Sequence, residues 1–369
     1  MKPYTLLAVI QPGLEEIARE EIIALGYQDL GMVRGGIFLK GHLSTVIRLN
    51  LFCRTLSRVL IEIDQFEAKS FSQLEKQFSH TDWKSYVGDR KVCIRASCFR
   101  SALYHEKAVS ERLIASLAKA LGKPIDVVGS PDEDNTQLIV IHAVQDVFTI
   151  RMDSSGAHLH KRGYGICKED APLRETVAAA LLYRIGWPTS VNYLFDPMCG
   201  SGTIPIEAAL MAQNKTLHAM RDFSFKHWQT YQPEVFAKIA EESDAHSLST
   251  MQVHIVGSDY DAKAIRSAKA NAETAGVSGS ISFGVSALSE INIDKKFMVL
   301  TNPPWGKRIN DGSVRRIWQV LSDQAVKGSS VHLLLPEIQE SEFPYPFSTL
   351  LSFSSGDIRV KLIKLEVRL

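Results

Sequence analysis

The residues with the clearest chemical potential follow a strand expected at Met298–Asn302, where the chain continues as Pro303, Pro304 and Trp305. The side-chain oxygen of Asn302 and the backbone carbonyl of Pro303 can each accept one hydrogen from an amino group on an aromatic ring. Such bonds favour a pyramidal nitrogen, whose lone pair can attack an electrophile. The prolines restrict the backbone, and the Trp305 indole offers a face on which a base can stack. We predict chemistry at a base amine, with this tetrad as the catalytic residues and no metal.

A glycine-rich loop lies upstream, where an expected strand at Tyr193–Asp196 turns into a helix. Gly200 and Gly202 would let the backbone pass close to a ligand, and the helix start after them offers unpaired N–H groups. The loop lacks the Gly-Lys-Ser/Thr of a P-loop and the GxGxxG dinucleotide pattern. We predict a cofactor loop, with a ligand-free tight turn as the alternative. The residues expected to contact the cofactor are Asp196, Pro197, Met198, Cys199, Gly200, Ser201, Gly202 and Thr203.

A carboxylate, Asp259, follows the next expected strand, Val253–Gly257, after one serine. An acid at this place can accept hydrogen bonds from ribose hydroxyls. Asp259 could instead cap the helix that runs to Ala275, although Asp261 directly precedes that helix and is the better cap. With the glycine loop, Asp259 predicts an adenosyl cofactor, and Tyr260 and Asn302 join its expected contacts.

Composition describes an ordinary globular chain of 369 residues, 45% hydrophobic and 22% charged, with a formal net charge of +1. Any nucleic-acid surface must therefore be local. The five cysteines form no CxxC pair, so neither a disulfide framework nor a structural zinc site is expected. The start of the chain resembles a first strand more than a signal peptide, and no apolar stretch reaches the roughly 18 residues that span a bilayer. We expect a cytoplasmic protein without membrane contact.

The pattern of apolar residues changes along the chain. Strands and helices alternate irregularly through residues 1–65 and 66–153, which favours two α+β units. A polar, glycine-bearing linker is expected at 154–171. In 172–369, strands alternate with longer helical segments, which is typical of a mostly parallel sheet covered by helices on both faces. The fold class is therefore α/β, and the strands expected beyond the first are Val253–Gly257, Ile281–Phe283, Met298–Asn302, Val331–Leu335, Phe347–Phe353 and Ile358–Val367.

These motifs resemble the THUMP-domain class I S-adenosylmethionine-dependent RNA guanine-N2 methyltransferases, often labelled N6-adenine-specific DNA methylases. Pro12–Glu16 is similar to the start of that family's N-terminal domain, and Lys161–Tyr164 with Ala171–Thr176 to the segment before its catalytic domain. Arg221–Trp228 resembles its insertion before the second strand, which would explain the 63 residues between Asp196 and Asp259. The resemblance covers nearly the whole chain.

The resemblance implies a Rossmann-like class I methyltransferase domain, with a mostly parallel seven-stranded sheet, at 172–369. Ferredoxin-like and THUMP RNA-binding domains at 1–65 and 66–153 would precede it. It also implies S-adenosyl-L-methionine as the cofactor and rRNA or tRNA as the partner, with guanine N2 as the favoured amine. Arg162, Tyr164 and Arg174 are the implied RNA contacts, although Gly165 replaces an arginine that is frequent in the family. Ser286 stands near the place where many relatives carry an acid that contacts adenine, and it completes the expected cofactor site.

Three alternatives use part of the same sequence. A DNA adenine-N6 methyltransferase would have the same tetrad. A cytosine-C5 methyltransferase would need a cysteine nucleophile at the tetrad position, and none of the five cysteines is there. The third alternative is an RNA-binding protein with an inactive methyltransferase domain, against which the intact Asp196 and Asn302 argue.

Overall fold

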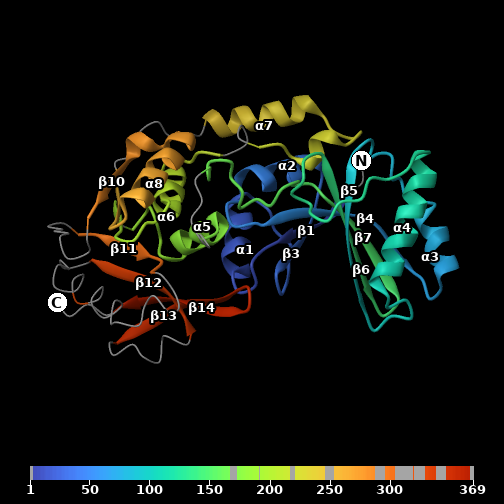
Figure 1. Ribbon diagram of the computed structural model, residues 1–369, viewed down its shortest axis with the longest axis horizontal. Helices are drawn as coiled ribbons and strands as arrows, with labels where there is room; N and C mark the ends of the chain where they lie inside the picture. The colour runs from blue at the N-terminus through green and yellow to red at the C-terminus, as the bar shows by residue number, and fades with distance from the viewer. Residues whose placement is uncertain are drawn as a thin grey trace.

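The computed structural model describes residues 3–166, 173–190, 192–216, 221–245, 253–286, 296–303, 319, 329–337 and 346–365. Within these residues the chain builds two seven-stranded sheets. They lie at opposite ends of an elongated molecule, with helices and connecting segments between them (Figure 1).

The N-terminal sheet has the strand order β2-β3-β1-β4-β7-β6-β5. Neighbours are antiparallel except β5 and β6, which are parallel. Strands β6 and β7 form an antiparallel hairpin. The strands are β1 (Tyr4–Val9), β2 (Gly31–Val33), β3 (Gly36–Gly41), β4 (Arg58–Glu67), β5 (Lys91–Phe99), β6 (Thr136–Val144) and β7 (Val147–Asp153).

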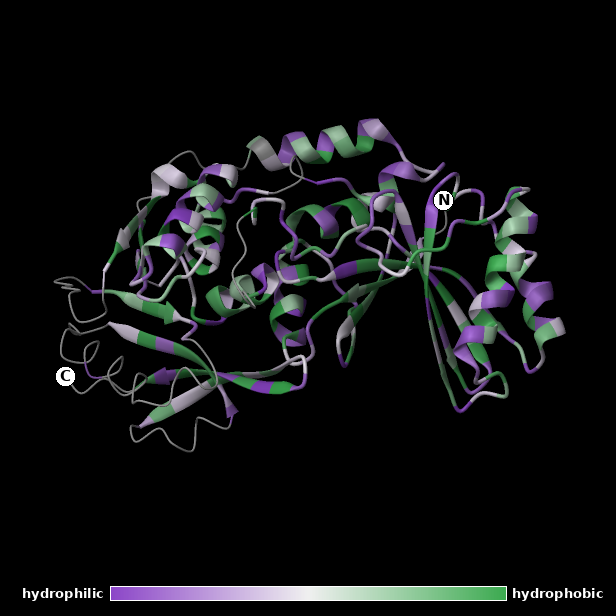
Figure 2. Ribbon diagram, viewed as in Figure 1, coloured by the Kyte–Doolittle hydropathy of each residue, from purple (hydrophilic) through white to green (hydrophobic). Residues whose placement is uncertain are grey.

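Four helices accompany this sheet: α1 (Glu15–Ala24), α2 (Leu43–Phe52), α3 (Phe71–Phe78) and α4 (Glu106–Leu121). Side chains at alternate strand positions, such as Leu6, Ile61, Ile141 and Ile150, have no exposed surface. This alternation is what a sheet with one covered face requires. In Figure 2 the apolar stripes of the helices face these strands.

Strand β4 joins the two units that the sequence suggested at 1–65 and 66–153. It pairs with β1 on one side and β7 on the other, so the expected boundary at residue 65 lies inside a strand. Strand β4 continues to Glu67, because its second half pairs with β7 beyond an irregularity between Glu62 and Asp64. The two units therefore share one continuous sheet.

The second sheet has the order β10-β9-β8-β11-β12-β14-β13. Its first five strands are parallel, and β14 is antiparallel to both β12 and β13. This confirms the Rossmann-like α/β fold with an antiparallel late strand. The strands are β8 (Tyr193–Asp196), β9 (His254–Asp259), β10 (Ile281–Val285), β11 (Met298–Thr301), β12 (Ser330–Pro336), β13 (Phe347–Ser355) and β14 (Ile358–Leu365). The described helices of this half of the chain are α5 (Glu175–Arg184), α6 (Thr203–Ala212), α7 (Pro233–Ala245) and α8 (Ala262–Thr274), with short 3-10 turns η2 (Ser224–His227) and η3 (Ser278–Ser280). Helix α7 contacts α2 of the N-terminal unit.

The segment expected as a polar linker, Ser154–Ala171, is described to residue 166, and its first two residues are packed rather than exposed. Ser154 and Ser155 are fully buried. The Ser154 hydroxyl donates to the Val59 carbonyl at 2.6 Å, and the Ser155 hydroxyl donates to Asn50 Oδ1 at 2.6 Å. The linker prediction was therefore wrong for this part, because its polar side chains bond to the N-terminal sheet and helix α2 instead of to water.

The insertion Arg221–Trp228 packs against the N-terminal sheet. The Trp228 indole N–H donates to Gln137 Oε1 on β6 at 3.0 Å, and Arg90 Nη2 donates to the Ser224 hydroxyl at 3.1 Å. Phe225 and Trp228 are buried. The insertion is thus held against strand β6 and against Arg90, the residue before β5.

Candidate functional site

The glycine loop connects β8 to α6 at the carboxyl edge of the second sheet. Gly200 and Gly202 have φ values of +52° and +88°, which L side chains rarely adopt. A Cβ on Gly202 would also lie 3.0 Å from the Ala268 Cβ of α8. The loop is held from the far side, because the Asn271 amide donates to the Ser201 carbonyl at 3.1 Å. The sequence therefore needs glycine here to bring the loop backbone down between α6 and α8.

Asp196 ends β8 and is almost fully buried. Its Oδ1 accepts from the Thr301 hydroxyl at 2.7 Å and from the Met198 amide at 3.2 Å. Burial raises the pKa of this carboxyl to about 7, although the Thr301 and Met198 bonds act in the opposite direction. Asp196 therefore links the cofactor loop to β11, the strand that precedes Asn302.

Asp259 at the end of β9 also holds the loop. Its Oδ2 accepts from the Gly200 amide, and its Oδ1 from the Asp261 amide, both at 3.0 Å. Asp261, not Asp259, caps α8 by accepting from the Lys263 amide at 2.8 Å. The sequence preference for Asp261 as the cap is confirmed, and Asp259 remains available as an acceptor at the sheet edge.

Two further expected cofactor residues lie beside Asp259. The Ser286 amide donates to the Asp259 carbonyl at 3.1 Å, which brings the end of β10 to this edge. Tyr260 is 78% exposed. An exposed ring directly after an acceptor carboxylate provides an apolar face for a planar group. The ends of β8, β9 and β10 thus place Asp196, Asp259, Tyr260 and Ser286 along one edge.

Asn302 follows β11 on the same edge. Its side-chain oxygen is buried, and no group in the described part of the chain donates a hydrogen bond to it. An unsatisfied buried acceptor costs about 1–3 kcal/mol, so a donor supplied by a ligand would be stabilised there. Pro303 is buried next to it. Pro304 and Trp305 lie outside the described residues, and their catalytic roles stay predictions.

Two of the three expected RNA contacts lie in the interior, so their assignment is corrected. Arg162 Nε and Nη2 donate to the two carboxylate oxygens of Glu207 at 3.3 and 3.2 Å. The Tyr164 hydroxyl donates to Glu207 Oε1 at 2.9 Å. Arg162 and Tyr164 are 5% and 2% exposed. Both residues pair with the fully buried Glu207 of α6 and cannot reach RNA from there.

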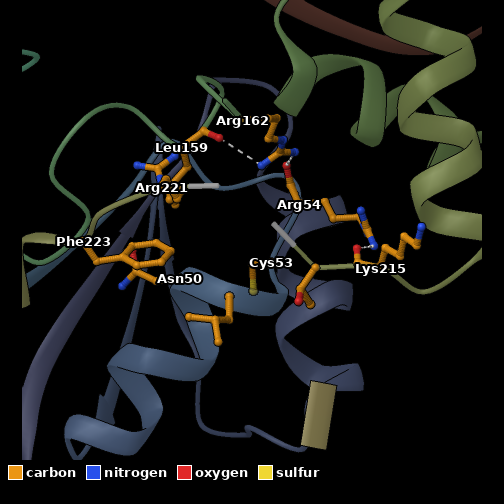
Figure 3. A pocket seen from close by; sticks show the side chains of 10 residues that line it. Asn50, Cys53, Arg54, Leu159, Arg162, Lys215, Arg221 and Phe223 are labelled. Carbon is orange, nitrogen blue, oxygen red and sulfur yellow. Dashed lines mark hydrogen bonds between the residues drawn. The ribbon is translucent and has the colours of Figure 1, made fainter. Parts of the chain in front are cut away.

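Glu207 was not identified from the sequence, although one acid in the apolar run Thr203–Ala212 was a usable signal. Arg162 also donates to the carbonyls of Leu159 and Arg54, so the network ties α6 to the N-terminal sheet (Figure 3). We call residues 154–166 the connector. Figure 3 shows a cavity beside this network, lined by residues of α2, of the connector, of the insertion and of the segments that follow α2 and α6. None of its lining residues belongs to the glycine loop.

Arg174, the third expected RNA contact, is exposed at the N-terminus of α5. Its Nη1 donates to Gln11 Oε1 at 3.2 Å.

Among the described residues, no group of three or more His, Cys, Asp or Glu side chains could hold a metal ion. The helices within the same part of the chain are too short or too polar to cross a membrane.

The fold and this edge define a class I methyltransferase domain, and sequence comparison assigns it to a family. Residues 162–333 match the family described as RMKL-like, methyltransferase domain, and residues 5–60 match the RlmL ferredoxin-like domain. The chain belongs to this RMKL-like methyltransferase family.

Among its relatives is YpsC of Bacillus subtilis (strain 168), named provisionally as an RNA methyltransferase. The two are 31% identical over 318 residues, which cover 84% of this chain and 81% of YpsC. The ribosomal RNA large subunit methyltransferase K/L of Shewanella amazonensis is 33% identical over 86% of this chain, and the match spans 46% of that longer protein. The crystal structure of SMU.472, provisionally a methyltransferase and complexed with SAH, has a TM-score of 0.84. At 24% identity over 100% of this chain and 99% of that one, it supports the shared fold.

Proposed function

We propose that this protein is an S-adenosylmethionine-dependent RNA methyltransferase that acts on an exocyclic base amine, with guanine N2 as the favoured target. The observation that carries the proposal is the buried side-chain oxygen of Asn302, to which no described group donates, at the edge that also holds the glycine loop. A base amine supplies the donor that this oxygen lacks. RNA as the substrate class is supported by the names of YpsC and the K/L enzyme.

The residues at the edge fit an adenosyl cofactor. Gly202 is too close to α8 for a side chain, and the chain turns there directly into the N-terminus of α6, where the first backbone N–H groups of a helix lack intrahelical partners. Asp259 can accept from ribose hydroxyls, and Tyr260 and Ser286 would flank an adenine ring bound beside it. The cofactor supplies an electrophilic methyl group when bound. SMU.472, which shares the fold, was crystallised with SAH.

The chain's own contribution to the reaction is positioning. Asn302 Oδ1 and the Pro303 carbonyl each accept one hydrogen of the base amine, so the nitrogen lone pair points away from both acceptors. Thr301 and Asp196 hold this segment against the cofactor loop through their 2.7 Å hydrogen bond. Trp305 would stack on the target base. Alignment of the two reactants then provides much of the rate enhancement.

The N-terminal sheet supports structured RNA as the substrate over DNA. We propose that residues 1–65 form a ferredoxin-like domain and 66–153 a THUMP RNA-binding domain. The insertion Arg221–Trp228 bonds to β6 and to Arg90, and the Arg162–Glu207 pair links α6 to the segment that follows the N-terminal sheet. A rigid second unit next to an active site suits a folded nucleic acid whose target lies at a set distance from its anchoring element.

Mass spectrometry of modified nucleosides tests this function. RNA and DNA from a strain lacking the gene are incubated with the purified protein and labelled S-adenosylmethionine, then digested to nucleosides. We expect label in N2-methylguanosine from RNA. Label in N6-methyl-2′-deoxyadenosine from DNA would establish the DNA methyltransferase alternative. No label in either, with cofactor binding retained, would favour an RNA-binding protein with an inactive domain.

A further inference from the structure

Four side chains form a compact surface where the connector meets α5. We call the surface made by His158, His160, Lys161 and Arg174 the connector face. The two imidazole rings stack with centroids 5.2 Å apart and an interplanar angle of 25°. Both are half-buried, whereas Lys161 and Arg174 are exposed. The face therefore combines planar rings with long cationic side chains, in the manner of single-strand binding surfaces.

The charges around the rings are mainly positive. Burial lowers the pKa of His158 to about 4, and Arg58, Arg174 and Lys161 lower it further, against an opposing effect of Asp132. The pKa of His160 is also about 4, from burial first and then from His158, Arg174 and Lys161, again opposed by Asp132. Both imidazoles are thus neutral at physiological pH, and each can offer a ring face without charge repulsion from the neighbouring cations.

The two cations differ in their partners. Lys161 pairs with Asp132 at 2.8 Å. The Arg174 guanidinium donates to the neutral amide of Gln11, and within the described residues it forms no ion pair. Arg174 is therefore an exposed charge whose other donors can meet an anionic group.

The connector face lies toward the carboxyl edge of the second sheet. Helix α5 leads into β8, whose last residue, Asp196, starts the cofactor loop. A helix that precedes a strand of a wound sheet runs antiparallel to it, so the N-terminus of α5 lies at the strand's carboxyl end. Glu175 in the first turn of α5 and Glu207 in α6 both act on the charge of Arg162, which agrees with this placement.

We propose that the connector face holds unpaired nucleotides of the substrate RNA beside the methyl-accepting base. The stacked imidazoles contact a base, and Arg174 contacts a phosphate. The inference rests on the proposed RNA methyltransferase function and adds a binding surface between the N-terminal sheet and the cofactor edge. RNA fits better than an acidic protein segment, because stacked neutral rings contribute to binding a base but little to binding carboxylates.

The imidazoles and the cationic side chain predict different effects of substitution on RNA affinity and on its salt dependence. Removing a stacking ring weakens binding without changing its salt dependence, whereas removing a phosphate contact lowers the slope of log affinity against log salt by about 0.7 for a single strand. We expect His160→Ala to weaken binding roughly tenfold, and His160→Phe to restore it because the planar face returns. Arg174→Gln should lower the slope.

Fluorescence anisotropy with the full-length protein measures both effects. The probe is a labelled RNA strand of about 12 nucleotides, compared with an abasic strand of the same length. His160→Ala should weaken binding of the RNA but not of the abasic strand, while Arg174→Gln should weaken both. The matched control is Arg184→Gln, which removes an exposed arginine at the other end of α5.

Equal affinities of wild type and His160→Ala for the RNA strand would overturn the stacking role. An unchanged salt slope in Arg174→Gln would overturn the phosphate role. If Arg184→Gln weakened RNA binding as much as Arg174→Gln, the effect would be one of overall charge and not of a contact at the connector face. An acidic peptide that competes with the RNA strand through His160 would identify a protein partner and contradict the proposal. Methyl transfer to cellular RNA is measured separately in the same variants. Normal transfer together with unchanged strand binding would refute the role of the connector face and leave the proposed methyltransferase function intact.

Discussion

Asp196→Asn gives a stability prediction that follows directly from the site. Burial raises the pKa of Asp196 to about 7 from an ordinary value of 3.8. The folded protein therefore holds this proton to higher pH than the unfolded chain does. As pH rises from about 4 to about 7, the unfolded chain loses its proton first and the folded state becomes relatively less stable.

The size of the effect follows from the pKa difference. About 3 pKa units, at about 1.4 kcal/mol each, correspond to a cost of about 4 kcal/mol that is fully present above pH 7. Asparagine keeps the shape and the Oδ1 acceptor for Thr301 and Met198 but does not titrate. The free energy of unfolding of the variant relative to wild type should therefore rise across this window and level off above it.

Urea unfolding at several pH values between about 5 and about 8 measures this difference. Asp357→Asn, in the exposed β13–β14 turn, is the control for removing one negative charge from the surface. A constant difference between Asp196→Asn and wild type across the whole range would refute the account of a carboxyl protonated by burial.

Three further predictions concern the network and the loop. Glu207→Ala leaves the buried Arg162 charge unpaired and should lower the free energy of unfolding by about 3–5 kcal/mol. Glu207→Gln should lower it by less. Equal decreases for the two variants in chemical denaturation would argue against an ion pair. An alanine at Gly202 would have to adopt a φ of +88° with its Cβ close to α8. Gly202→Ala should therefore lower the free energy of unfolding by about 1–3 kcal/mol and weaken cofactor affinity. Unchanged affinity by calorimetry would show that the glycine loop does not bind the cofactor. Asp259→Ala should weaken cofactor binding and leave α8 capped, and calorimetry showing no change would limit Asp259 to holding the loop backbone.

The second sheet was predictable because its signals are local. Apolar runs of strand length, separated by helical segments, indicated parallel strands, and each candidate cofactor residue followed one of those runs. The carboxyl ends of parallel strands meet at one edge. The positions of Asp196, Asp259 and Asn302 along the chain were therefore enough to predict that they share an edge.

The interior position of Arg162 and Tyr164 was not predictable in the same way. Their partner Glu207 lies 45 residues from Arg162, and nothing near Lys161–Tyr164 in the sequence indicates a buried carboxylate. A buried arginine is stable only when it is paired, so the burial became evident only with the tertiary structure. The continuous N-terminal sheet has a similar cause, because β4 pairs with strands on both sides of the expected boundary.

Asn302→Ala tests the central claim most directly, because Asn302 supplies the acceptor for the base amine. Methyl transfer to RNA from a strain lacking the gene and cofactor binding by calorimetry are measured on the same preparation. We expect transfer to be lost, while cofactor affinity stays close to wild type. Retained transfer would contradict the assigned role of Asn302, whichever base proves to be the substrate.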